Sequence, residues 1–413
     1  MSLTVRILIG LVVGLSLGIL LGAVGPAWQP MALVAADTVG GLWMDGLRMT
    51  IIPLVFALLV VGIARVVGAG AAGGLATRSL LWFAGLLLAS ALLTAVLMPL
   101  LLSIWPPPQI AVEGLRAGAA TVTPPEVQPM GAAFLRSFIP VNPVQTEAEG
   151  QVAPLVVFAG LFGLAAIRLA PDLRDRIVGF FDAVAEAMLV LVGWVLWLGP
   201  AGVFALAVGV GARAGAGAAG ALLHYVILIS AVCITMGVLM YPLVVAVTRI
   251  SPLRFARAAL PAQVVAFSTQ SSIASLPSMF GGARSLGVSD RSAGVVLPLA
   301  VSLFRITSPA ANLAVAIYVA HVTGLHLSPG HLLVGALVAA TISFASVGLP
   351  GQITFFTTIG PVSLAMGVPV TLLPLLLAVE VVPDIFRTIG NVTADLAVTK
   401  LAAHGAGEAE EAD

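Results

Sequence analysis

The last long apolar segment of the sequence carries polar and ionisable side chains in its middle. At about 100° of rotation per residue, a helix would present these side chains within one arc of about 100°. They are Glu380, Asp384, Arg387, Thr388, Asn391 and Asp395. Ionisable groups inside a membrane-spanning helix are costly and usually serve a function. The pattern therefore predicts a binding site for a charged solute.

The side chains on this face suit a zwitterionic dicarboxylate. Arg387 can bind a carboxylate through two parallel hydrogen bonds. Asp384 can accept an ammonium group, Asn391 can hydrogen-bond a second carboxylate, and Asp395 is available for a cation or a proton. The alternative is an ion pair between Asp384 and Arg387, three residues apart, that only neutralises itself. The other polar groups on the same face favour a binding site.

Arg305 places a second charge inside a different apolar segment, and Pro309 follows it. Proline lacks a backbone donor and frees a carbonyl one turn earlier, so we expect the helix to be unwound beside Arg305. An Arg near a helix end could instead extend its head to the membrane surface. The central position of Arg305 favours a fixed positive charge near the site.

The composition shows what must hold these groups. Of 413 residues, 60% are hydrophobic and 9% are charged, against about 25% charged in soluble domains. Apolar runs of the roughly 20 residues needed to cross a bilayer recur along the chain, so we predict an all-α polytopic membrane protein. The 18 basic and 18 acidic residues balance without a polybasic stretch, which excludes a nucleic-acid partner.

Two apolar stretches, 267–277 and 343–352, are interrupted by small polar and helix-breaking residues. Irregular backbone at membrane depth must be buried in protein or line a watery cavity, so we predict two re-entrant hairpins. Kinked helices are the alternative. A long helix follows each hairpin, at 291–321 and 367–402, which indicates an inverted repeat. Paired interruptions of this kind mark the substrate site of transporters.

The remaining apolar runs predict helices at 3–24, 35–68, 78–104, 151–170, 174–211 and 218–249. Between them, the Pro-rich stretch 105–150 is expected to be an extracellular loop. Arg residues gather in the short loops on the other side, which predicts that both termini are cytoplasmic. The acidic tail, 403–413, is expected to be disordered.

The motif from Asp384 to Asp395 reads D-I-F-R-T-I-G-N-V-T-A-D, and it resembles the D-x-x-R-T-x-x-N-V-x-x-D signature of the glutamate transporter family, the dicarboxylate/amino-acid:cation symporters. Further matches are Ile52-Pro53-Leu54-Val55-Phe56, Ser271-Ser272, Leu276-Pro277 and Gly348-Leu349-Pro350-Gly351. The resemblance implies eight transmembrane helices plus two re-entrant hairpins, arranged as inverted repeats in the inner (plasma) membrane.

The resemblance also implies a homotrimer that works as an elevator. Helices 1 and 2 (1–77) and helices 4 and 5 (151–211) would form a fixed scaffold. Helix 3 (78–104) and the segment 218–402 would form the transport domain, which moves across the membrane with its solute.

The same resemblance implies a role for each site residue. Asp384 would bind the substrate ammonium, Arg387 its side-chain carboxylate, and Asn391 its α-carboxylate together with backbone near Ser272. The tip of the second hairpin, from Leu349 to Gln352, would be the gate. The full expected substrate-binding set is Asp384, Arg387, Thr388, Asn391, Arg305, Ser308, Ser271, Ser272, Leu349 and Gly351.

The sequence departs from the family at the N-M-D-G-T motif, which supplies sodium ligands but here reads Phe304-Arg305-Ile306-Thr307-Ser308. Two oxygen ligands are lost, and Arg305 would repel a cation about 4 Å away by about 4 kcal/mol at an effective dielectric of 20. A residual sodium site at Asn391 and Asp395 is one interpretation; replacement of the ion by Arg305 is another. Proton coupling through Glu380, Asp384 or Asp395 would then substitute for sodium.

The combined prediction is a secondary active transporter of L-aspartate or L-glutamate, with sodium coupling reduced or lost. Transport of non-amino C4-dicarboxylates is an alternative, because Arg305 could pair with Asp384, and an anion channel is another. Its partners would be a small anionic solute and membrane lipid, with no cofactor beyond Na⁺ or H⁺. The five His residues are scattered, without an H-E-x-x-H or G-x-S-x-G motif, so an enzyme is not expected.

Overall fold

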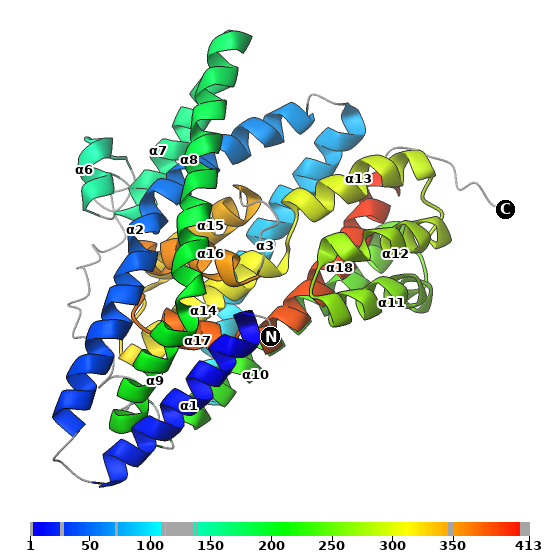
Figure 1. Cartoon of the computed structure of the whole chain (residues 1–413). Coiled ribbons are helices and arrows are strands. Elements are labelled where there is room, and N and C mark those ends of the chain that lie inside the picture. The colour runs from blue at the N-terminus through cyan, green and yellow to red at the C-terminus, as the bar shows by residue number, and fades with distance from the viewer. Residues whose placement is uncertain are drawn as a thin grey trace.

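The computed structural model describes residues 3–24, 29–70, 73–108, 112, 136, 139–149, 151–215, 217–345 and 351–404. Every regular element in these ranges is a helix (Figure 1). Six of the described helical stretches are long and apolar enough to cross a membrane: Val5–Ala23, Pro30–Gly68, Gly74–Ile104, Pro171–Trp197, Ala219–Thr248 and Asp290–Thr323. The predicted all-α membrane class is confirmed.

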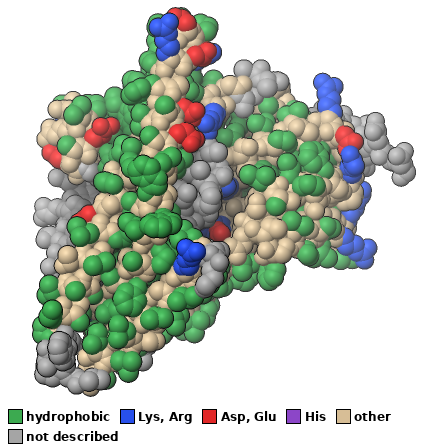
Figure 2. All heavy atoms as spheres, in the orientation of Figure 1, with side chains coloured by type: hydrophobic (Ala, Val, Ile, Leu, Met, Phe, Trp, Pro, Cys, Tyr) green, Lys and Arg blue, Asp and Glu red, His purple; other side chains and the backbone are tan. Residues whose placement is uncertain are grey.

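The outer surface of the molecule suits lipid. Large apolar side chains point outward from many helices, among them Leu42, Leu81 and Trp194, each at least 66% exposed. Figure 2 shows apolar side chains over most of one face, with acidic and basic groups gathered mainly at the tip of α8 (Pro171–Trp197) and near α12 (Ser272–Ser285).

The helices form two groups, within which they pack most extensively on one another. The first group contains α1 (Leu3–Val24), α2 (Gln29–Gly70), α7 (Val152–Ala166), α8 and α9 (Gly199–Ala214). The second group contains the elements that follow α9, together with α3 (Gly74–Ile104). The short helix α6 (Pro143–Ala148) lies in the stretch predicted to be a loop and packs on α7.

The second group is built from pairs of shorter helices. Its members are α10 (Gly217–Thr248), α11 (Pro252–Thr269), α12, α13 (Asp290–Leu303), α14 (Thr307–Thr323), α15 (Pro329–Ala345), α16 (Gly351–Ala365), α17 (Leu373–Val379) and α18 (Val381–His404). Helices α11 and α12 form a helical hairpin, with Gln270 in the left-handed region (φ 52°) and Ser271 as the N-cap of α12. Helices α15 and α16 also pack together, but 346–350 between them lies outside the described residues.

The predicted unwinding beside Arg305 is confirmed, because α13 ends at Leu303 and α14 begins at Thr307. Pro309 cannot donate to the Arg305 carbonyl, which instead accepts a hydrogen bond of 2.9 Å from the Ser308 amide.

Two other predicted helices were wrong in that each is split. The 174–211 helix divides between Trp197 and Gly199, where Pro200 follows. The 367–402 helix divides at Glu380, and Pro383 falls in the first turn of α18. In both cases proline removes a helical donor, and its fixed φ favours a new helix start.

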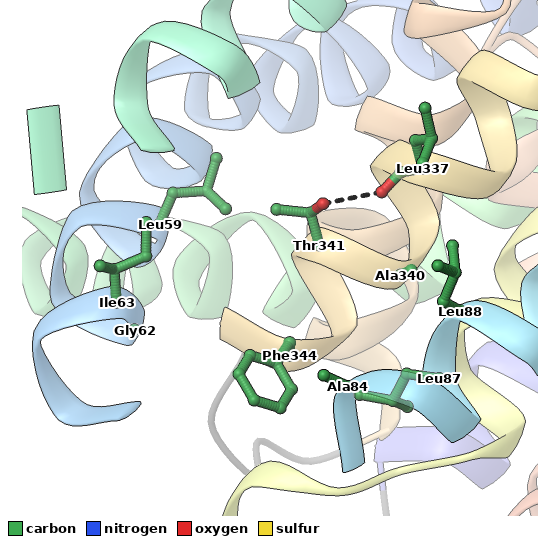
Figure 3. A pocket seen from close by; sticks show the side chains of 10 residues that line it. All are labelled: Leu59, Gly62, Ile63, Ala84, Leu87, Leu88, Leu337, Ala340, Thr341 and Phe344. Carbon is green, nitrogen blue, oxygen red and sulfur yellow. Dashed lines mark hydrogen bonds between the residues drawn. The ribbon is translucent and has the colours of Figure 1, made fainter. Parts of the chain in front are cut away.

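The two groups meet where α2 contacts α3, α15 and α16, and where α17 packs on α1 and α9. An apolar cavity of about 280 Å³ lies between α2, α3 and α15, lined chiefly by Leu59, Ile63, Leu87, Leu88, Leu337 and Phe344 (Figure 3). The Thr341 hydroxyl in its wall donates to the carbonyl of Leu337, on its own helix. This part of the boundary is therefore apolar and loosely packed.

Helices α1 and α9 lie unusually close because glycine recurs every fourth residue on α1, at positions 10, 14, 18 and 22. A Cβ atom at Gly14 would lie 2.5 Å from the Phe204 carbonyl oxygen, and one at Gly18 would lie 2.4 Å from that of Val208. Small residues at such positions let membrane helices approach closely.

We predict that Gly14→Ala lowers the stability of the solubilised protein by about 1–3 kcal/mol, because the added methyl group meets rigid backbone. The control is Gly41→Ala on α2, where a Cβ would have no neighbour within 4 Å. Thermal unfolding followed by tryptophan fluorescence compares the two. Equal melting temperatures for both variants would contradict close packing of α1 on α9.

Candidate functional site

The break between α17 and α18 holds a buried ion pair. The Arg387 guanidinium lies 2.8 Å from a carboxylate oxygen of Glu380, and both side chains are only 6% exposed. The other carboxylate oxygen accepts a hydrogen bond of 2.7 Å from the Tyr225 hydroxyl on α10. The Cys233 side chain, also on α10, is fully buried and interacts electrostatically with Arg387. Arg387 is thus held at the break by Glu380, which α10 supports through Tyr225.

Thr307 joins the unwound segment to α18. Its amide and hydroxyl donate to the Asn391 side-chain oxygen at 3.0 and 2.8 Å, and its hydroxyl also lies 3.0 Å from the Arg387 carbonyl. Because the Asn391 oxygen accepts these bonds, its amide nitrogen is the side-chain group suited to a solute carboxylate. Gly390 allows this approach, since a Cβ there would lie 2.6 Å from the Thr307 methyl carbon.

Arg305 lies in the unwound segment and interacts electrostatically with Asp384 and Asp395. Asp395 is completely buried, and neither of its carboxylate oxygens accepts a hydrogen bond from the described residues. Asp384 is half-buried and interacts with both Arg305 and Arg387. Two basic and three acidic side chains therefore gather around the two helix breaks.

The structure brings most of the predicted site residues into one region. The Thr388 hydroxyl donates to the Asp384 carbonyl at 2.9 Å, and Ser308 is buried in the first turn of α14. Ser271 and Ser272 begin α12, which packs against α18, and the Ser271 hydroxyl accepts from the Ala274 amide. Gly351 is the first residue of α16. Leu349 lies outside the described residues.

Two residues of this region were not predicted. Thr307 was noted only as part of the altered motif, and Tyr225 looked like one more residue of an apolar helix. A further buried network joins His224 to the carbonyl of Trp105 at 2.9 Å and to the hydroxyl of Tyr318 at 3.2 Å. Polar aromatic residues inside apolar helices were the signal that could have revealed these contacts, because buried tyrosine hydroxyls usually find a partner.

The residues beside Arg305 do not suit a metal ion. Phe304 is buried and stacks on Phe83 with ring centroids 4.9 Å apart, and Ile306 is 2% exposed. Neither offers the oxygen ligands that hard cations require. Among the described residues, no group of three or more His, Cys, Asp or Glu side chains could hold a metal.

Interrupted helices with buried charges at their breaks define a class of membrane protein, the secondary transporters, which bind solutes at such places. The sequence profile of the sodium:dicarboxylate symporter family matches residues 3–404. The chain belongs to this family, which confirms the resemblance seen in its motifs. Membership of a symporter family indicates transport, and not catalysis, as the general function.

The relatives that the chain resembles are named for different solutes. The chain is 25% identical over 374 residues to the proton/glutamate-aspartate symporter of Escherichia coli, covering 87% of this chain and 84% of that protein. It is 25% identical over 421 residues to C4-dicarboxylate transport protein 2 of Mesorhizobium japonicum, covering 100% and 91%. It is 29% identical over 270 residues to neutral amino acid transporter A of Homo sapiens. This match covers 61% of this chain and 48% of that protein, so the chain spans about half of that relative's length.

We predict that Thr307→Val lowers stability by about 1–3 kcal/mol, because it leaves the Asn391 oxygen with one donor fewer in a buried place. The control is Thr323→Val at the end of the same helix, where the hydroxyl donates only to the helix's own carbonyls. Thermal unfolding and solute binding are measured for both variants. A Thr307 variant as stable as the Thr323 variant would show that the link between α14 and α18 is unimportant.

Proposed function

We propose that the protein is a secondary active transporter of acidic amino acids, L-aspartate and L-glutamate. The observation that carries the proposal is the buried Arg387 with Asp384 on the same polar face of α18 and an available amide nitrogen on Asn391. A guanidinium suits the side-chain carboxylate, a carboxylate suits the ammonium group, and the amide suits the α-carboxylate. The name of the Escherichia coli relative supports this solute class.

A proton is the coupling ion that the charges favour. Arg305 and Arg387 oppose three carboxylates, those of Glu380, Asp384 and Asp395, which leaves one net negative charge before an anionic solute arrives. Glu380 also occupies Arg387, at 2.8 Å. Protonation of Glu380 would weaken this ion pair and free the guanidinium for a solute carboxylate. Sodium coupling would be reduced or lost, because Asn391 already uses its side-chain oxygen.

The transport movement proposed is an elevator. The first helix group would be the fixed scaffold, and the second group would carry the binding site across the membrane. The whole chain would contain eight transmembrane helices and two re-entrant hairpins. The apolar cavity between α2, α3 and α15 supports such sliding, because packing there is loose. We further propose a homotrimer in the inner membrane with both termini cytoplasmic, and a gate at 349–352.

One observation favours a second solute class, the non-amino C4-dicarboxylates. Arg305 interacts electrostatically with Asp384, so Asp384 could be neutralised without an ammonium group. Arg305 and Arg387 would then each face one carboxylate of the solute. The name of the Mesorhizobium japonicum relative agrees with this alternative.

The test is uptake of labelled L-aspartate into liposomes containing the purified protein, in sodium and in choline buffer, with succinate as competitor. We expect uptake that is indifferent to sodium and inhibited by L-glutamate more than by succinate. Asp384→Asn should reduce aspartate uptake at least tenfold and spare succinate. Uptake abolished in choline would disprove the loss of sodium coupling, and competition by succinate alone would identify the second solute class.

We predict that Glu380→Gln removes the pH dependence of uptake. Wild-type uptake should fall as pH rises, because ionised Glu380 holds Arg387, whereas glutamine imitates the protonated state at every pH. Initial uptake rates between pH 5.5 and 8.5 test this. The control is Glu186→Gln on α8, whose side chain is exposed; a Glu380 variant with the profile of this control would exclude Glu380 as the proton carrier.

A further inference from the structure

We propose that Arg305 is an internal counter-cation for Asp395, a covalently attached positive charge that takes the place of a bound metal ion. The proposal deepens the proposed function, since it gives the physical reason for transport without sodium. It assigns Arg305 a positioning and charge-balancing role, separate from the groups that contact the solute.

Asp395 requires a positive partner or a proton. It is completely buried in α18, and neither carboxylate oxygen accepts a hydrogen bond from the described residues. An ionised carboxylate in such surroundings is strongly disfavoured unless a charge of opposite sign lies nearby. A structure that keeps this side chain must therefore neutralise it.

Arg305 is the cation whose charge acts on it, from the unwound segment that Thr307 ties to Asn391, one turn before Asp395 on α18. Its guanidinium interacts electrostatically with Asp395 and Asp384, and the only charged partner that acts on Asp395 among the described residues is Arg305. The other guanidinium of the site, that of Arg387, is held by Glu380 at 2.8 Å. The two arginines thus share Asp384, whereas Glu380 pairs with Arg387 and Asp395 interacts with Arg305.

A free metal ion would find poor ligands in the same place. Phe304 and Ile306 flank Arg305 with buried hydrocarbon, and Phe304 is fixed by stacking on Phe83. The Asn391 side-chain oxygen accepts two hydrogen bonds from Thr307. The family name implies sodium, but the side chains of this segment do not fit it, whereas a guanidinium needs only nearby carboxylates.

Neutralising Arg305 should therefore make Asp395 depend on a cation from solution. We expect the melting temperature of wild-type protein to be equal in sodium chloride and choline chloride. In Arg305→Met, Asp395 should be neutralised by a proton, which becomes scarcer as the pH rises. Between pH 5 and pH 8 in choline chloride, the melting temperature of this variant should therefore fall by at least about 2 °C more than that of wild type. Sodium at pH 8 should restore part of this loss if it binds Asp395.

The double variant Arg305→Met/Asp395→Asn keeps the proposal testable even if Arg305→Met is unstable. It should lose the added pH and sodium responses and melt at a higher temperature than Arg305→Met at pH 8. Arg305→Lys should resemble wild type. The control is Arg284→Met, which removes one arginine of an exposed ion pair with Asp290 and should leave both responses at their wild-type size.

Two results would overturn the proposal. One is a wild-type protein that sodium stabilises as much as it stabilises Arg305→Met. The other is an Arg305→Met variant that has neither added response and gains nothing from Asp395→Asn. Because the measurement uses no solute, failure to transport aspartate would reject the proposed substrate without affecting this test.

Discussion

Charged side chains inside an apolar helix bundle must be neutralised by partners, and the packing of the other helices depends on this requirement. Glu380 and Arg387 form an ion pair at one helix break, and Arg305 lies at the other with Asp384 and Asp395 within its electrostatic reach. Lipid offers no partner for such groups. The breaks in α13/α14 and α17/α18 therefore have to meet inside the bundle, and this requirement fixes how α10, α14 and α18 pack.

The contacts that hold the breaks together also join neighbouring helices of the second group to one another. Hydrogen bonds from Thr307 to Asn391 and from Tyr225 to Glu380 join helices of the second group. Ion pairs such as Arg65 with Asp182 join helices of the first group. By contrast, the two groups face each other partly across an apolar cavity. Directional bonds resist displacement more than apolar contacts do, and this contrast supports the proposed elevator movement of one group against the other.

Local sequence patterns predicted the parts of this arrangement that local chemistry decides. Arg305 followed by Pro309 indicated the unwound segment, and helical spacing placed Asp384 to Asp395 on one face. The pattern could not show that Glu380 pairs with Arg387, or that Tyr225 supports it, because these partners come from a helix break and a remote helix. The splits near residues 198 and 380 were not predicted, because the sequence stays apolar on both sides of each break and hydropathy alone does not show where a helix ends.

The chain shares a family with relatives whose names differ in solute, from dicarboxylates to neutral amino acids. Membership of the family therefore does not fix the solute, and on our proposal the charges at the helix breaks decide which solute and ion fit. In this chain Arg305 lies in the segment that, by its resemblance to the family motif, was expected to supply ion ligands. On our proposal Arg305 is a tethered cation that cannot dissociate, so it balances the charge of Asp395 in every state but transfers no energy from an ion gradient. On our proposal, accumulation of the solute must then be driven by protons or by exchange against another solute.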